Sequence, residues 1–162
     1  MSLALRIEPD AGHQLTIARI YDAPRALVFR MWMEPDHMRV WSCPRGMTIP
    51  EATGGTAATG GSFRVVMQRP DGQRHVMRGT YLDVSPIERI AFTHQWEEDG
   101  WEDNGGLSPR TTVTVSFEDT PDGKTKLTLH QGDFRNAAVR DGHQAGWTES
   151  LDKLGEHLRS VA

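Results

Sequence analysis

The clearest hydrophobic pattern of the chain lies near its end, over residues 136–160. Leu151, Leu154 and Leu158 recur at steps of three and four, which places them on one face of an α-helix. Asn136 is a suitable residue to cap the start of this helix. A helix with one apolar stripe must bury that stripe against another element, so the preceding chain is expected to supply a partner.

Most of the preceding chain alternates between apolar and polar residues with the period of two that is typical of β-strands. We expect strands over residues 14–21, 63–67, 74–84, 89–96, 111–118 and 124–130. Between the first two, Asp22-Ala23-Pro24 signals the start of one helix, and Pro35 ends it and allows a second short helix to begin. Residues 44–61 are rich in glycine and fit either a loop or a short strand.

This order of elements predicts an α+β fold. A curved antiparallel sheet wraps around the long C-terminal helix, and two short helices after strand 1 close one end of the space between sheet and helix. A chain of 162 residues suits one domain. We place that domain at residues 13–162, with residues 1–12 as an N-terminal arm.

Composition narrows the partners. The net charge of −4 gives no electrostatic reason for binding nucleic acid or an anionic membrane, and no apolar run is long enough for a membrane span. The N-terminus lacks the pattern of a signal peptide. The single cysteine, Cys43, cannot form an internal disulfide. We therefore expect a cytoplasmic protein that binds no nucleic acid, and a homodimer is compatible with the sequence.

Side-chain alternation identifies the residues that face the helix. If Phe92 points inward, so do His94 and Trp96 on the same strand. On the helix, His143 lies one turn before Trp147 and shares its face. A mainly apolar, aromatic wall with few polar groups is typical of a small-molecule site. The predicted ligand-binding residues are Met67, His94, Trp96, Phe117, His143, Trp147 and Leu151.

Two histidines are the candidates for chemistry. His94 and His143 can act as general acid and base on an enclosed ligand, or each can be a partly buried histidine with an ordinary hydrogen bond. No close spacing of histidine or cysteine indicates a metal, and we predict no cofactor. Cys43 fits either a nucleophile or a small buried residue. The loop at residues 97–109 fits either a lid or a solvated connection.

Several short motifs, in this order, resemble the START-like (SRPBCC) superfamily of helix-grip proteins: Asp22-Ala23-Pro24, Val28-Phe29, Pro35-Asp36, Trp41 and Gly60-Gly61. A further set is similar to the branch named for the activator of the heat-shock-protein-90 ATPase: Gly79, Pro86-Ile87-Glu88-Arg89-Ile90, and Gly146-Trp147 with Leu151 and Leu154. The resemblance covers residues 14–160 and implies a helix-grip fold with a hydrophobic cavity. Thr56 and Ala58 stand where that family commonly has charged residues.

Three functions follow as hypotheses. The first is binding of a small hydrophobic or aromatic ligand between the sheet and the C-terminal helix. The second is an enzyme of the cyclase, dehydratase or hydrolase type, with His94 and His143 as its acid and base. The third, implied by the resemblance, is a co-chaperone-like regulator of an ATPase.

Overall fold

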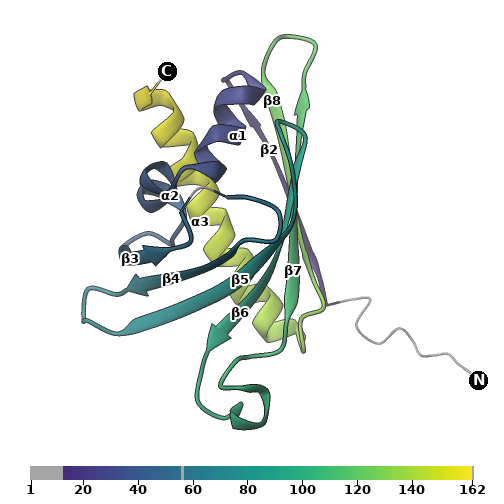
Figure 1. Ribbon diagram of the computed structural model, residues 1–162. Helices are drawn as coiled ribbons and strands as arrows, with labels where there is room; N and C mark the ends of the chain where they lie inside the picture. Colours follow the sequence, from purple (N-terminus) through teal and green to yellow (C-terminus); the bar gives the residue numbers. More distant parts are fainter. Residues whose placement is uncertain (1–12, 56, 162) are drawn as a thin grey trace, which may run out of the picture.

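The computed structural model describes residues 13–55 and 57–161, and the predicted arm at residues 1–12 lies outside them. Within the described residues, seven strands form one antiparallel sheet that curves around the long helix α3 (Ala137–Val161), as Figure 1 shows. The predicted helix-grip arrangement is confirmed. The strands are β2 (Leu15–Tyr21), β3 (Thr48–Thr53), β4 (Ser62–Gln68), β5 (Arg74–Ser85), β6 (Arg89–Glu97), β7 (Thr111–Asp119) and β8 (Thr125–Gly132).

The sheet pairs the first described strand of the chain with the last one. Its strand order is β2-β8-β7-β6-β5-β4-β3, so β2 pairs with β8, with Leu15 opposite Gln131 and Tyr21 opposite Thr125. β3 forms the other edge and lies in the segment that the sequence left open. Of its six residues only Ile49 is buried. The alternation that marks the other strands is therefore missing from β3.

Two short helices follow β2, as predicted: α1 (Arg25–Met33) and α2 (Pro35–Trp41). Pro35 begins α2 because its fixed φ suits a first helical position, and Glu34 between the helices is extended. α1 begins directly after the predicted Asp22-Ala23-Pro24 signal. Pro24 is its N-cap residue, and no side chain caps the helix, so the Asp22 carboxylate does not supply the capping acceptor that such a signal implies.

α3 begins where the sequence predicts. Asn136 Oδ1 accepts a hydrogen bond of 2.9 Å from the backbone N–H of Val139, which satisfies one of the free amides at the helix start. The buried residues of α3 all lie in its second half: Ser150, Leu151, Leu154 and Leu158. The first half of α3 is therefore not closely packed against the sheet.

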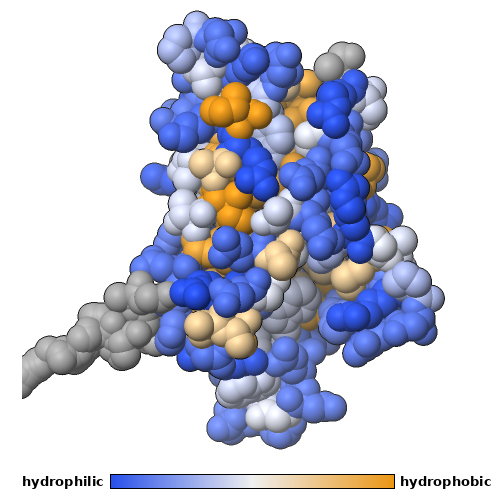
Figure 2. Space-filling view, turned by 180° about the vertical axis from the view of Figure 1, so that it is seen from behind, coloured by the Kyte–Doolittle hydropathy of each residue, from blue (hydrophilic) through white to orange (hydrophobic). Residues whose placement is uncertain are grey.

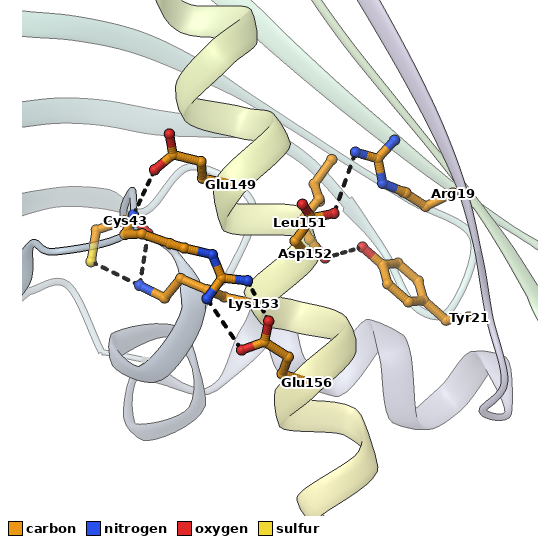
Figure 3. A network of polar contacts seen from close by, with 9 residues as sticks. Arg19, Tyr21, Cys43, Glu149, Leu151, Asp152, Lys153 and Glu156 are labelled. Carbon is orange, nitrogen blue, oxygen red and sulfur yellow. Dashed lines mark hydrogen bonds and ion pairs between the residues drawn. The ribbon is translucent and has the colours of Figure 1, made fainter.

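Polar contacts fix this second half from two sides (Figure 3). On one side, the Tyr21 hydroxyl on β2 donates to the backbone oxygen of Leu151 over 2.7 Å. On the other, Lys153 Nζ donates to the backbone oxygen of Cys43 over 2.8 Å, and the Arg45 guanidinium pairs with Glu156. Contacts from separate elements thus hold α3 at a fixed position above the sheet.

Candidate functional site

A cavity of about 410 Å³ lies between the first half of α3, the helices α1 and α2, and the inner face of β4, β5 and β6. Its described lining residues are Trp32, Met38, Trp41, Ser42, Pro44, Met47, Phe63, Val65, Met67, Arg69, His75, Met77, Tyr81, Phe92, His94, Trp96, Glu98, Arg135, Val139, Gly142, His143, Gly146, Trp147 and Ser150. Most are apolar or aromatic, the usual character of a small-molecule pocket.

Two glycines on α3 leave room for this cavity. Gly142 and Gly146 are one turn apart and both line it. A Cβ atom at Gly142 would meet nothing within 4 Å, and one at Gly146 would approach only the Pro44 side chain, at 3.5 Å. Each glycine costs an exposed helix about 1 kcal/mol relative to alanine. The pair therefore weakens the helix slightly and keeps its cavity face open.

Three tryptophans form the inner end of the cavity. The rings of Trp32 and Trp41 meet edge to face with centroids 4.5 Å apart, and Trp147 stacks on Trp32 at 6.0 Å. Trp41 Nε1 donates to the backbone oxygen of Met31. Trp32 Nε1 is buried and has no hydrogen-bond partner among the described residues. This wall consists of large aromatic rings, and the unpaired N–H group of Trp32 is enclosed within it.

A buried polar chain holds Trp147 against the sheet. Trp147 Nε1 donates to Gln131 Oε1 over 2.7 Å, Gln131 Nε2 donates to Thr111 Oγ1 over 2.8 Å, and the Thr111 hydroxyl donates to the backbone oxygen of His94. Gln131 is fully buried. Neither Gln131 nor Thr111 is among the residues predicted from the sequence. A signal existed, because Gln131 continues the inward alternation of Leu127 and Leu129 on β8.

His143 has both ring nitrogens engaged. Its Nδ1–H donates to the backbone oxygen of Val139 over 2.8 Å, and its Nε2 accepts the indole N–H of Trp96 over 2.9 Å. This pattern assigns the neutral ring with the proton on Nδ1. Burial lowers the pKa of His143, and the positive charge of Arg135 lowers it further. His143 is therefore a neutral, fully paired link between α3 and β6.

His94 differs from His143 in having no partner. Its ring is 5% exposed, lines the cavity and lies edge to face against His143 with centroids 5.5 Å apart. Neither ring nitrogen makes a hydrogen bond within residues 13–55 and 57–161. Burial lowers the pKa of His94 to about 3, with a smaller contribution from His143. At neutral pH the cavity therefore holds one uncharged imidazole with a free donor and a free acceptor.

The mouth of the cavity is charged. Arg69, Glu98, Arg135 and Gly142 line it and are also exposed, so they mark where it opens to solvent. Glu98 lies in the loop after β6, which folds on itself through a short 3-10 helix (Glu102–Asn104). The loop at residues 97–109, for which the sequence fits either a lid or a solvated connection, therefore contributes a rim residue to the cavity.

A family model described as "Activator of Hsp90 ATPase homolog 1-like protein" matches residues 22–159. The chain belongs to this family. Among solved structures, an AHSA1 protein from Silicibacter pomeroyi is 23% identical with a TM-score of 0.81, covering 92% of this chain and 99% of its own. A protein from Chromobacterium violaceum is 24% identical with a TM-score of 0.80, covering 90% and 96%. These likenesses show the fold. No curated protein matches the sequence.

In this activator-homolog fold, five of the seven predicted ligand-binding residues lie around one cavity: Met67, His94, Trp96, His143 and Trp147. The other two, Phe117 and Leu151, face inward as expected but lie outside the lining. Phe117 packs against Phe29 at 5.2 Å and against Trp32 at 6.4 Å, and Leu151 is fully buried in the same core. Inward orientation alone does not separate core from cavity.

The remaining candidates lie elsewhere in the activator-homolog domain. Cys43 is buried outside the cavity lining, and its thiol donates to the backbone oxygen of Met47. Within the described residues, no group of three histidine, cysteine or acidic side chains is placed to hold a metal ion. No helix in this part of the chain is long and apolar enough to cross a membrane.

Proposed function

We propose that the protein binds one small, largely apolar molecule, aromatic in part, in the cavity beneath the first half of α3. The observation that carries the proposal is the buried ring of His94, which lines the cavity without a hydrogen-bond partner among the described residues. The His94 nitrogens are not among the fully enclosed polar atoms of the described residues, so they are open to the cavity that the ring lines. A ligand with a hydroxyl, amide or carbonyl group can form a hydrogen bond with them.

The size and surface of the cavity suit such a ligand. Its volume of about 410 Å³ falls in the range of about 300–1,000 Å³ that is typical of small-molecule sites. Apolar contact with Phe63, Met67 and Trp147, which keep some accessible surface, supplies most of the binding free energy, at about 25 cal/mol for each Å² of apolar surface removed from water. Pairing with His94 supplies specificity, because a molecule without a polar atom there leaves the imidazole unsatisfied.

The two histidines favour binding over acid–base catalysis. A general acid or base works best with a pKa near the working pH. The pKa of His94 lies near 3, so its ring is a weak base at neutral pH. Both nitrogens of His143 are already engaged, to Val139 and Trp96. Neither ring is prepared to exchange a proton with a ligand.

The role as an ATPase regulator lacks a comparable observation. Hydrophilic side chains cover most of the face shown in Figure 2, with apolar groups in small areas between them. The exposed large apolar side chains of the described residues come from four different elements: Ile20 on β2, Val40 on α2, Leu82 on β5 and Val161 on α3. A docking surface for another protein needs a larger contiguous patch.

The test fills the cavity from the helix. Gly142→Leu places a side chain at the cavity mouth where a Cβ atom meets nothing within 4 Å. Ala145→Leu is the matched control, because Ala145 is exposed on the same helix and lies outside the lining. The probe is N-phenyl-1-naphthylamine, a neutral aromatic amine whose fluorescence rises in apolar surroundings.

We expect the wild type and Ala145→Leu to bind the probe with similar affinity, and Gly142→Leu to bind it about tenfold or more weakly. Circular dichroism should show all three proteins folded. Equal binding by Gly142→Leu and the control would place the probe outside the cavity. No binding by any of the three would count against the proposed function itself.

A further inference from the structure

We propose that the ligand of this cavity is an organic acid, whose apolar body lies inside and whose single carboxylate lies at the mouth between Arg69 and Arg135. This inference rests on the proposed function and adds the chemical class of the ligand. It comes from the charges on the lining. The described lining residues carry two guanidinium groups and one carboxylate, that of Glu98, whereas the whole chain has a net charge of −4.

The two arginines at the mouth are unlike most others in the described chain. Arg64 and Arg78, for example, both pair with Glu97 on the outer face of the sheet, at 2.9 and 2.6 Å. Neither Arg69 nor Arg135 has an acidic partner within residues 13–55 and 57–161. Their charge is therefore not neutralised by the protein.

Neutral groups hold both arginines in place instead. Arg69 Nε donates to His75 Nε2 over 3.1 Å, which leaves the terminal N–H groups of the guanidinium available. The Arg135 guanidinium lies over the indole ring of Trp101, 5.4 Å from its centroid, and it makes no hydrogen bond within the described residues, so its N–H groups remain available. Both contacts position a cation without saturating its donors.

Glu98 offsets only part of this charge. Its Oε2 accepts the indole N–H of Trp101 over 2.9 Å, which ties the carboxylate to the same ring that carries Arg135. The two guanidinium groups and the one carboxylate give the mouth a net charge of about +1. A single carboxylate matches that charge, and its two oxygens suit the forked geometry of a guanidinium. A cationic ligand would meet two arginines and is disfavoured.

The depth of the polar groups sets the shape of the ligand. The arginines are exposed at the mouth, whereas His94 is buried and the wall between them is mainly apolar. The acid group therefore stays hydrated at one end while the body is buried, which avoids the large cost of enclosing a charge. A second polar atom on the body, such as a hydroxyl, pairs with His94.

Two dyes with nearly the same body test the inference. 8-Anilinonaphthalene-1-sulfonate carries one negative charge, and N-phenyl-1-naphthylamine is the same skeleton without the acid group. The sulfonate stands for the carboxylate as a singly charged, hydrogen-bond-accepting head. Both dyes are titrated into the wild type, into the double variant Arg69→Gln/Arg135→Gln, and into Arg159→Gln. Arg159 is an exposed arginine in the last turn of α3, outside the cavity lining.

We expect the wild type to bind the anionic dye more tightly than the neutral one. The double variant should bind the anionic dye about three- to tenfold more weakly than the wild type does, since exposed charge pairs are partly screened. Its affinity for the neutral dye should stay within about twofold of the wild-type value. Added salt should weaken the binding of the anionic dye alone. Arg159→Gln should change neither affinity.

The outcomes separate the two levels of the proposal. Tight binding of both dyes with no change for the anion in the double variant would overturn the acid inference and leave the binding function standing. An equal loss of anion binding in Arg159→Gln would attribute the effect to net charge and also overturn it. Failure of both dyes to bind the wild type would overturn the proposed function and this inference together.

Discussion

The two halves of α3 have different structural roles. In the second half Leu151, Leu154 and Leu158 are buried, and Tyr21 bonds the helix to β2. The first half presents Gly142, His143, Gly146 and Trp147 to a cavity of about 410 Å³. One continuous helix thus provides both the anchor of the fold and the roof of a site. Changes in the second half should therefore affect stability, and changes in the first half should affect binding.

The largest expected effect comes from truncating a buried side chain in the second half of α3. Leu154→Ala removes a fully buried side chain and should lower the free energy of unfolding by about 2–5 kcal/mol. Val139→Ala in the first half should cost below about 1 kcal/mol, because Val139 is half-buried and already borders the cavity. Urea denaturation measures both. Similar losses in the two variants would show that the halves do not differ in packing.

The next largest effect is the pH dependence of stability that His94, a residue of the cavity, should cause. The pKa of His94 is about 3 in the folded protein and 6.5 in its ordinary state. Between these values the unfolded chain binds a proton that the folded protein does not. The free energy of unfolding should therefore be highest above pH 6.5 and fall by about 1.4 kcal/mol per unit as the pH is lowered through that window.

His94→Gln should remove the contribution of His94 to the pH dependence of the free energy of unfolding. The measurement is urea denaturation between pH 7 and pH 4.5, and the contribution of His143 remains in both proteins with the same sign, because burial lowers its pKa as well. Parallel curves for the wild type and His94→Gln would show that the His94 ring is not held neutral by burial.

A smaller effect tests the contacts that anchor the second half. Tyr21→Phe deletes the hydroxyl that donates to Leu151, and it should cost about 0.5–1.5 kcal/mol of stability. Tyr81→Phe is the matched control, because the Tyr81 ring is buried but its hydroxyl makes no hydrogen bond within the described residues. Thermal unfolding compares the two. If Tyr81→Phe lost as much stability as Tyr21→Phe, the hydrogen bond from Tyr21 to Leu151 would have no particular stabilising role.

Local patterns in the sequence predict most of the architecture. Burial repeats with the period of each element, so Leu151, Leu154 and Leu158 mark α3, and Val113 and Val115 mark β7. The edge strand β3 escapes this reasoning because it has one buried residue and so no repeat. The position of the α1 start is as predicted, directly after Pro24, but a proline occupies the cap position and no side-chain acceptor caps the helix.

The candidate site is only partly readable from the sequence. Alternation assigns His94 and Trp96 to the inner face of the sheet, but it does not say where along α3 the packing stops. Phe117 shares that inner face and lies in the core. The pairing of Trp147 with Gln131 depends on how a helix and a strand meet across the fold, which no local pattern encodes.

The most direct test of the account is the state of the His94 ring. Long-range proton–nitrogen NMR spectra of the histidine rings should be recorded at pH 7 with and without saturating 2-naphthol, a neutral aromatic hydroxyl compound. We predict a neutral His94 whose ring nitrogen signals move on binding, while His143 keeps its proton on Nδ1. Unchanged His94 signals at saturation, or no binding of 2-naphthol, would contradict the claim that His94 forms a hydrogen bond with a ligand bound in the cavity.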